Sequence, residues 1–330
     1  MKVFSEFAEK KIMIAGGAGF LGKHCVQAFI DGGAKAENIT VPRSRDFDLR
    51  DRSAVHALLE KEQPQIVVNL AAKTGGIGSN QRYPASYFYD NLMIGVNLIE
   101  ACRQHSVEKF VNIGTVCSYP KIVDVPFVEE DLWNGYPEET NAPYGIAKKA
   151  IMVYGEAAFR QYGFNNINLL LTNAYGPGDD FHESTSHVIP AIIKKIMKAK
   201  DDNAPSIEAW GDGSPSRDFI YIEDAAEAIV LATALHNDPM PINLGAGKEI
   251  SIKELLETLV ELLEYDGDIA WDTTKPNGQP RRLLDTTKAI NSFGFHSKTP
   301  FHEGLKKTIE WYLKHRDNVD NLAPKFVFSK

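Results

Sequence analysis

The sequence contains little cysteine, no long apolar run and no excess of positive charge. Its 330 residues include three cysteines, a sparse and odd set that provides no disulfide framework and indicates a reducing compartment. No stretch approaches the ~20 apolar residues of a membrane span, and the N-terminus does not resemble a secretory signal. A net charge of −8 argues against a nucleic-acid-binding protein, which needs a basic surface. These absences predict a cytoplasmic globular protein without nucleic-acid, membrane or metal partners, and they leave room for an anionic small ligand.

What the sequence does contain is an alternation of short apolar runs and helical segments. This alternation predicts parallel strands joined by right-handed helical crossovers, which is a Rossmann-like, doubly wound α/β sheet. We expect a nucleotide-binding domain over residues 1–175, to which part of the later chain returns, and a smaller C-terminal α/β lobe over 176–330 that mainly binds substrate. Strands are expected at 11–15, 39–41, 66–70, 110–113 and 167–172, and helices at 21–30, 52–62, 92–105, 144–162, 251–264 and 304–315.

A glycine-rich turn follows the first predicted strand. Residues without a Cβ permit a tight turn, and a pyrophosphate can then approach the backbone N–H groups at the start of the next helix. A glycine triplet alone is a weak signal, and the alternative is a turn that binds nothing. Here the triplet lies between a strand and a helix, which is the context that the dinucleotide fingerprint requires. The predicted contacts are Gly16, Gly17, Ala18, Gly19, Phe20, Leu21 and Gly22.

The end of the second strand indicates which dinucleotide is bound. An acidic residue there would hold a ribose 2′-hydroxyl, whereas an arginine accommodates a 2′-phosphate. The chain has Arg43 and Arg45 and no carboxylate before Asp46. This favours NADP(H) over NAD, although both arginines are also compatible with a solvated surface.

Tyr144 and Lys148 lie one helical turn apart at the start of a predicted helix, so their side chains share a face. A nearby ammonium lowers the pKa of a phenol from about 10, which would let Tyr144 exchange a proton with a substrate oxygen while hydride moves. The same lysine can hold the cofactor ribose. This spacing often occurs by chance, but here the pair follows a glycine fingerprint. Thr115 at a strand end adds a hydroxyl for a substrate carbonyl, or alternatively satisfies backbone groups.

These features, with Asn91 in the preceding helix, resemble the extended short-chain dehydrogenase/reductase family. Several stretches resemble one branch of it, the GDP-L-fucose synthases, which are GDP-4-keto-6-deoxymannose 3,5-epimerase–4-reductases. Three departures stand out: Thr115 replaces a serine, the glycine loop lacks an arginine that can contact a 2′-phosphate, and Asn277 stands where an acidic residue is frequent. The similar stretches cover nearly the whole chain and include 71–77, 117–120, 142–148, 172–177, 181–190, 210–219 and 275–281.

The resemblance implies a mechanism with two stages at one carbonyl. Protons at C3 and C5 of a 4-keto sugar are acidic, and Cys117 as base and His187 as acid would invert both carbons while Tyr144 and Thr115 hold O4. NADPH then reduces C4. Taken alone, a cysteine after a strand is usually a small buried hydrophobe, and His187 could simply cap a helix.

The resemblance also assigns binding residues. Arg217 and Arg281 suit a pyrophosphate because a guanidinium makes bidentate contacts. Trp210 would pack on the guanine or ribose, with core packing as the alternative, and Lys195 would otherwise belong to a surface helix face. Further cofactor contacts are implied at Ala71, Ala72, Lys73, Ile113, Gly114, Lys148, Thr172, Asn173, Ala174 and His187, and substrate contacts at Lys195, Trp210, Arg217, Asn277 and Arg281.

The resemblance further implies a homodimer, because the helices at 92–105 and 144–162 are similar to those that form a four-helix interface in this superfamily. One alternative is a related GDP-sugar enzyme, either a C4 reductase alone or one that acts on a deoxyheptose or colitose precursor. Another is a non-catalytic relative, against which the intact Thr115, Tyr144 and Lys148 set argues.

Overall fold

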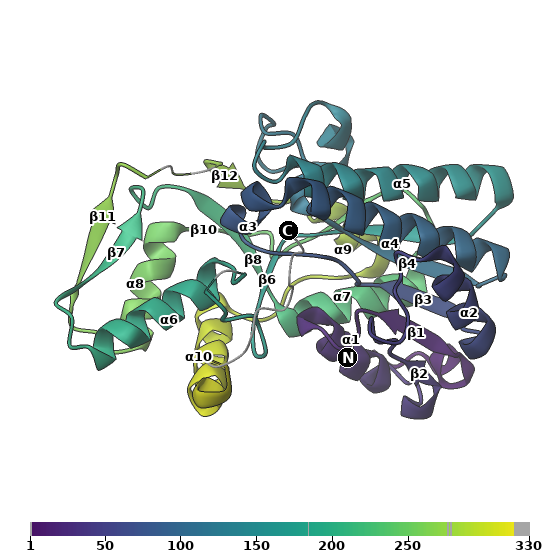
Figure 1. Cartoon of the computed structure of the whole chain (residues 1–330), viewed down its shortest axis with the longest axis horizontal. Helices are drawn as coiled ribbons and strands as arrows, with labels where there is room; N and C mark the ends of the chain where they lie inside the picture. The colour runs from purple at the N-terminus through teal and green to yellow at the C-terminus, as the bar shows by residue number, and fades with distance from the viewer. Residues whose placement is uncertain (1, 184, 276, 278, 320–330) are drawn as a thin grey trace.

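A six-stranded parallel sheet forms the centre of the computed structural model, which describes residues 2–183, 185–275, 277 and 279–319 (Figure 1). The strand order is β2-β1-β3-β4-β5-β9. The chain therefore moves outward from β1 to β2 and then back across β1 to β3. In such open sheets, ligands bind beyond the carboxyl ends of the strands at the point of reversal. The strands are β1 (Ile12–Ala15), β2 (Ile39–Thr40), β3 (Ile66–Asn69), β4 (Lys109–Thr115), β5 (Asn166–Leu171) and β9 (Ile242–Leu244).

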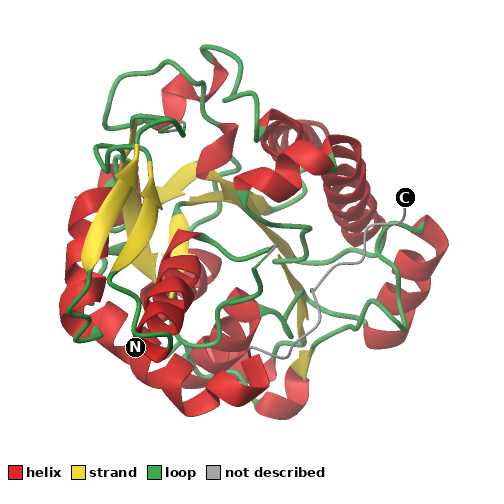
Figure 2. Ribbon diagram, turned by 60° about the vertical axis from the view of Figure 1, so that its left-hand side comes forward, coloured by secondary structure: helices red, strands yellow, loops and turns green. Residues whose placement is uncertain are grey.

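Helices cover both faces of this sheet (Figures 1 and 2). One apolar core joins the sheet to α1 and α7, and another joins its opposite face to α2, α4 and α5. Apart from β2 and the last residue of β5, the strands are buried along their whole lengths, as expected for a parallel sheet covered on both faces. The covering helices are α1 (Phe20–Asp31), α7 (Ile222–Leu235), α2 (Arg52–Glu62), α4 (Pro84–Gln104) and α5 (Ala142–Tyr162).

The remaining elements form a second cluster with its own apolar core. A four-stranded sheet has the order β10-β8-β12, with β6 also paired to β8, and β7 pairs in parallel with β11. Helices α6, α8 and α10 pack with these strands. The bounds are β6 (Asn173–Tyr175), β7 (Ser206–Trp210), β8 (Ser216–Tyr221), β10 (Glu249–Ser251), β11 (Asp268–Asp272), β12 (Arg281–Arg282), α6 (Val188–Asp201), α8 (Ile252–Leu262) and α10 (Phe301–Val319); the short helices α3 (Ile77–Arg82) and α9 (Thr287–Phe293) complete the set.

The structure confirms the predicted parallel α/β sheet and its elements, with shifts at some ends. Helix α4 begins at Pro84 rather than at residue 92, because proline suits the first helical position, where no N–H bond is needed. Ser251 caps α8, since its Oγ accepts a bond from Glu254 N at 3.0 Å. Helices α6 and α7 were not predicted. The division at residue 175 remains a prediction, although β9 comes from beyond it.

Within the described residues, no helix combines the length and the apolar character that crossing a membrane requires. Pro276 and Gly278, which belong to one of the stretches that carry the family resemblance, lie outside the described residues.

Candidate functional site

The glycine loop after β1 leaves no space for side chains. Gly16 has a φ of +81°, and a Cβ on it would lie 2.8 Å from the Ala71 backbone nitrogen. A Cβ on Gly22 would lie 2.2 Å from the Gly16 carbonyl oxygen. Gly19 caps α1, a helix of 12 residues whose first N–H groups point toward the loop. The loop thus forms a backbone cradle at a helix N-terminus, and this cradle fits a pyrophosphate.

Arg43 and Arg45 follow β2, the strand beside β1. Both side chains are exposed. Arg45 Nε lies 3.5 Å from an Asp46 carboxylate oxygen, an exposed ion pair that contributes little to stability. The two guanidinium groups therefore stand at the same sheet edge as the glycine loop, where sequence analysis places the 2′-phosphate.

Asn91 holds the loop that follows β3. Its side-chain oxygen accepts from Lys73 N, and its side-chain nitrogen donates to Lys73 O, both at 3.0 Å. Lys73 Nζ is also bonded to the buried Asp90, which accepts a second bond from Arg50 at 3.1 Å. Two neighbouring residues of α4 therefore fix both the backbone and the side chain of Lys73. Ala71 and Ala72 precede it on the same loop.

Thr115 ends β4 and Tyr144 lies in the first turn of α5, so a strand end and a helix start bring them together. Hydrogen bonding with Thr115 lowers the pKa of Tyr144, but burial raises it by more. Lys148 is 3% exposed, and its Nζ donates to the Ile113 carbonyl at 2.9 Å. Burial lowers the pKa of Lys148 to about 8.

The expected effect of Lys148 on Tyr144 differs from what the structure shows. Sequence reasoning has the ammonium lower the pKa of the phenol, whereas burial raises that pKa. The physical reason is that the Lys148 ammonium is held at a backbone carbonyl while both groups are desolvated. A phenol with a raised pKa is protonated at neutral pH, which suits a proton donor.

Cys117 is clamped against the helix that carries Tyr144. It lies in a 3-10 turn, Val116–Ser118, where Thr115 Oγ1 accepts from Cys117 N at 3.2 Å. Ser118 Oγ donates to Gly145 O at 3.0 Å. A Cβ on Gly145 would lie 2.3 Å from the Cys117 carbonyl oxygen, so only glycine allows this approach. Cys117 is partly exposed, whereas Cys25 and Cys102 are the buried cysteines.

Arg282 is a site residue that sequence analysis missed. Strands β8 and β12 are parallel, with Arg217 opposite Arg282 and Ser216 opposite Arg281. Residues in register point to the same face of a sheet. Arg282 Nη1 lies 3.7 Å from Cys117 Sγ. Arg281 is exposed and pairs with Glu249 at 2.7 Å instead. The adjacent arginines are visible in the sequence, but only strand register decides which one faces the thiol.

Arg217 lies beside Arg282 in the same place. Its Nη1 donates to the carbonyl oxygens of Ser216 and Gln279, each at 2.7 Å. Burial, together with repulsion from Arg282, lowers the pKa of Arg217 to about 10. The structure therefore brings Arg217 to Cys117 as well, while the carboxylate of Glu249 lies closer to Arg281.

His187 immediately precedes α6 and is exposed, with no capping hydrogen bond from its side chain. Helix capping therefore does not explain why a histidine stands at this position. The neighbouring Ser186 packs against the loop after β3, because a Cβ on Gly76 would meet the Ser186 carbonyl oxygen at 3.1 Å. Among the described residues, no hydrogen bond joins His187 to Cys117.

The predicted contacts at 172–174 lie between the two sheets. Thr172 Oγ1 and Asn173 Nδ2 both donate to the Asp218 carbonyl oxygen, at 3.0 and 3.2 Å. Ala174 follows in β6. Burial raises the pKa of the Asp218 carboxyl to about 7, although that carboxyl accepts a bond from Ala246 N at 2.9 Å.

The predicted guanine-side residues gather around β7. Trp210 is 63% exposed, so core packing, the alternative interpretation, is wrong. Its Nε1 donates to Glu208 Oε1 at 3.2 Å, and Lys195 Nζ donates to the Glu208 backbone oxygen at 2.8 Å. Asn277 Oδ1 accepts from Asp212 N at 3.0 Å. Lys195, Trp210 and Asn277 thus lie near the β7–β11 pair.

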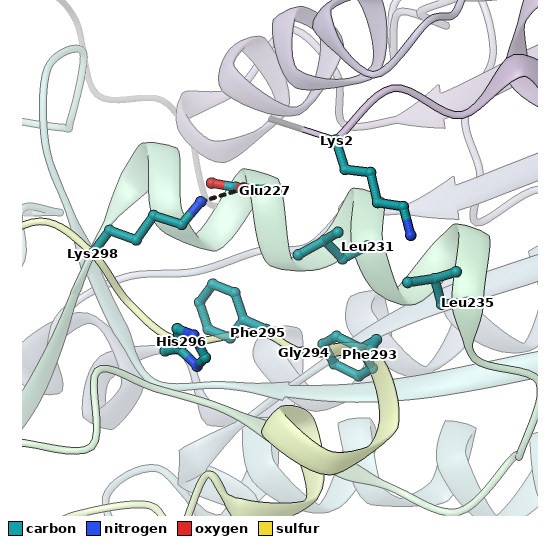
Figure 3. Close-up of a pocket in the computed structure, with 9 residues that line it drawn as sticks. All are labelled: Lys2, Glu227, Leu231, Leu235, Phe293, Gly294, Phe295, His296 and Lys298. Carbon is teal, nitrogen blue, oxygen red and sulfur yellow. Dashed lines mark hydrogen bonds and ion pairs between the residues drawn. The ribbon is translucent and has the colours of Figure 1, made fainter.

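A separate surface pocket of about 310 Å³ lies beside α7 and the segment after α9 (Figure 3). Lys298 and Glu227 form an ion pair at its rim, 2.6 Å apart. None of the predicted site residues lines it. The pocket is therefore distinct from the candidate site. Its lining residues are Lys2, Glu227, Leu231, Leu235, Phe293, Gly294, Phe295, His296 and Lys298.

Comparison with known proteins matches residues 12–245 to the NAD dependent epimerase/dehydratase family. The chain is 37% identical over 306 residues to a probable GDP-L-fucose synthase 1 of Oryza sativa subsp. japonica, covering 92% of each chain. It is 37% identical over 320 residues to the GDP-L-fucose synthase of Escherichia coli strain K12, covering 94% of this chain and 98% of that protein. Identity to the GDP-L-colitose synthase of Yersinia pseudotuberculosis is 31%, covering 93% of this chain and 99% of that protein.

Solved structures show the same similarity. A GDP-6-OMe-4-keto-L-xylo-heptose reductase from C. jejuni has a TM-score of 0.85 at 28% identity, covering 93% of this chain and 98% of that chain. A GDP-L-fucose synthetase from Naegleria fowleri bound to NADP has a TM-score of 0.82 at 26% identity, covering 96% and 97%. Both comparisons extend over the central sheet and the smaller cluster.

Proposed function

Because the chain belongs to the NAD dependent epimerase/dehydratase family, we propose that it converts GDP-4-keto-6-deoxy-D-mannose to GDP-L-fucose. The reaction is epimerisation at C3 and C5 followed by NADPH-dependent reduction at C4. The observation that carries the proposal is the close approach at Gly145, which packs the Cys117 turn against the helix of Tyr144, while Thr115 Oγ1 accepts from the Cys117 backbone. The charges of Cys117 and Tyr144 influence each other across this contact. Relatives named GDP-L-fucose synthase over nearly the whole chain support the same substrate.

The residues present fit NADP(H). The glycine cradle at the start of α1 would receive the pyrophosphate, Arg43 and Arg45 would contact the 2′-phosphate, and Lys148 would hold the ribose. Residues 71–73 follow β3, residues 113–114 lie near the end of β4, and residues 172–174 follow β5, so all three segments belong to the same edge of the sheet. When bound, NADPH supplies the hydride that reduces C4.

In the epimerisation stage, the Cys117 thiolate removes a proton from C3 or C5 and becomes a thiol. The electron pair of the broken C–H bond moves toward C4 and gives an enolate at O4. Thr115 Oγ1 accepts from Cys117 N, and its hydroxyl hydrogen, which faces the Tyr144 oxygen without substrate, would turn to O4. Tyr144 donates a second hydrogen bond to O4.

His187 then gives a proton to the opposite face of the same carbon, and the C4 carbonyl forms again. Sulfur has gained one proton and the imidazole has lost one. Both groups exchange with water before the second carbon reacts, so solvent hydrogen enters the product at each inverted centre.

In the reduction stage, an alkoxide forms at O4 and takes the phenolic proton of Tyr144. Burial raises the pKa of Tyr144, so the phenol carries this proton at neutral pH. The same hydroxyl therefore serves the enolate first and the alkoxide afterwards.

The GDP portion is proposed to lie between β7 and the β8–β12 pair. Trp210 offers an exposed aromatic surface for the guanine or ribose, with Lys195 and Asn277 nearby. Arg217 faces the thiol side and is suited to the diphosphate. Arg281 remains a predicted contact, and its ion pair with Glu249 would have to open for that role.

A homodimer is proposed through α4 and α5, which pack side by side (Figure 1). These helices leave large apolar side chains exposed, as a helix-pair interface requires. The exposed residues are Phe88, Tyr89, Val153, Phe159 and Tyr162.

The alternative is a related GDP-4-keto-sugar enzyme, acting on a colitose or deoxyheptose precursor or reducing C4 alone. It is favoured by relatives named GDP-L-colitose synthase and GDP-heptose reductase. The two functions differ in whether both C3 and C5 exchange with solvent.

The deciding experiment incubates the protein with GDP-4-keto-6-deoxymannose and NADPH in deuterated water, with NADH in a parallel reaction. The proposal predicts GDP-L-fucose that carries deuterium at C3 and C5, with faster oxidation of NADPH than of NADH. Reduction without exchange would indicate a C4 reductase. Neither exchange nor NADPH oxidation would contradict both enzymatic functions for this substrate.

A further inference from the structure

The thiol of Cys117 faces two cations, of which Arg282 is buried and Arg217 is partly buried. Arg282 is 8% exposed, and its Nη1 is 3.7 Å from Cys117 Sγ. Arg217 is its register partner on the neighbouring strand. Their hydrogen bonds go to neutral oxygens: Arg282 Nε donates to Gln279 Oε1 at 2.7 Å, and Arg217 donates to backbone carbonyls. Two adjacent guanidinium groups without a bonded carboxylate among the described residues create a strongly positive environment.

We propose that Arg282 is a positioning residue that stabilises the Cys117 thiolate through its guanidinium group, and so sets the fraction of the protein that can act as a base. The inference rests on the proposed function for the base role of Cys117. It extends that function with a residue from a strand 165 positions further along the chain.

The groups that face Cys117 explain why Arg282 should have the largest electrostatic effect on its thiol. From α5 comes the Tyr144 phenol, a neutral donor at neutral pH, and from the end of β4 comes the Thr115 hydroxyl. From β8 comes Arg217, whose own charge is influenced by the more distant Glu138 and Glu249. The Glu249 carboxylate bonds to Arg281 on the opposite face.

A cation favours a nearby thiolate, because it lowers the energy of the charged form. An arginine is suited to this task, since its guanidinium stays protonated throughout the physiological range. Gln279 fixes the direction of the group by accepting from Nε, which leaves Nη1 aimed at the sulfur. Strand register explains why Arg282, and not the neighbouring Arg281, has this effect.

The test measures the rate of Cys117 alkylation by iodoacetamide against pH in the full-length protein without substrate. Cys25 and Cys102 are fully buried, so labelling followed by peptide mass spectrometry reports on Cys117. Arg282→Gln should raise the midpoint pH by about 1 or more. At pH 7 its alkylation should slow about tenfold.

Two variants serve as controls. Arg281→Gln removes the same charge from the neighbouring position and should leave the midpoint where it is in the wild type. Arg282→Lys keeps a cation and should recover most of the wild-type rate of Cys117 alkylation at pH 7. A folded Arg282→Gln variant whose midpoint equals that of the wild type would overturn the inference, and so would an equal shift in Arg281→Gln.

If Arg282→Gln does not fold, Gln279→Ala provides the test, because it removes the acceptor that orients Arg282 while keeping the guanidinium. The midpoint pH of Cys117 alkylation in this variant should rise, though by less than 1 pH unit. An unchanged midpoint pH would contradict the inference.

Deuterium exchange at C3 and C5 separates this inference from the proposed function. Arg282→Gln should slow exchange with little change in the KM for NADPH. Slowed exchange with an unchanged thiol midpoint would mean that Arg282 binds substrate instead, which overturns the inference. A shifted midpoint in a protein whose wild type shows no exchange would contradict the proposed function and leave the thiolate assignment standing.

Discussion

The two sides of the candidate site are built in different ways. The hydride side consists of Thr115, Tyr144 and Lys148, which come from one strand end and the first two turns of one helix. The thiol side consists of Cys117, Arg217 and Arg282, together with the more distant His187. These residues come from a 3-10 turn, two strands of the smaller sheet and the start of α6. The hydride side thus comes from residues 115–148, whereas the thiol side draws on residues from 117 to 282.

This difference has a physical consequence. On the hydride side, the sheet and α5 fix each group with its neighbours, as the bond from Lys148 to the Ile113 carbonyl shows. On the thiol side, the positions of the side chains depend on contacts between segments that meet only in the folded chain. Gly145 is the joint, because it brings the Cys117 turn against the helix of Tyr144.

The largest effect is expected from Tyr144→Phe on the hydride side. Losing the phenolic proton removes general-acid catalysis, which contributes about a hundredfold to ten-thousandfold. NADPH oxidation with the keto sugar should fall by that factor while NADPH still binds. Tyr154→Phe, on the same helix but bonded to Glu100, is the matched control. Reduction at the wild-type rate in Tyr144→Phe would refute the assignment.

Cys117→Ser should give a smaller effect that is confined to the thiol side. A hydroxyl is a much weaker base than a thiolate near neutral pH, so exchange at C3 and C5 should slow about a hundredfold. The dissociation constant for NADPH should stay the same, as measured by fluorescence titration. The buried Cys102→Ala serves as control. Exchange that survives in Cys117→Ser would assign the base to another group.

Gly145→Ala tests the joint between the two sides. The added Cβ would lie 2.3 Å from the Cys117 carbonyl oxygen, so the turn must move. We expect a loss of about 1–3 kcal/mol in the free energy of unfolding and slower exchange, with reduction less affected. Gly78→Ala, where no atom lies within 4 Å of the new Cβ, is the control. Equal effects of the two substitutions would show that the close approach has no importance.

The smallest effect concerns Asp218, next to Arg217. Burial raises its pKa to about 7 from 3.8, so between these values the folded state keeps a proton that the unfolded chain has lost. The free energy of unfolding therefore falls as pH rises through this range. Asp218→Asn should flatten the dependence of Tm on pH between 4 and 8 by a few degrees. The exposed Asp266→Asn should not, and a flat wild-type profile would contradict the burial effect.

The comparison also explains what the sequence could predict. The sheet and the shared face of Tyr144 and Lys148 follow from the strand and helix periods of about 2 and 3.6 residues, and the glycine loop follows from a short local motif. The structure contains all three. Arg282 could not be found in this way, because the phase of a two-residue strand decides whether it or Arg281 faces the thiol. Helix α7 was missed because it is buried nearly all round and shows little amphipathic contrast.

We propose that one hydroxyl joins the two sides, since Tyr144 would hold O4 in both stages. The direct test measures deuterium incorporation at C3 and C5 by Tyr144→Phe in deuterated water, beside its rate of NADPH oxidation. We expect exchange to slow together with reduction, because the enolate loses a hydrogen bond. Exchange at the wild-type rate with reduction abolished would contradict it, and would mean that the two stages do not share Tyr144.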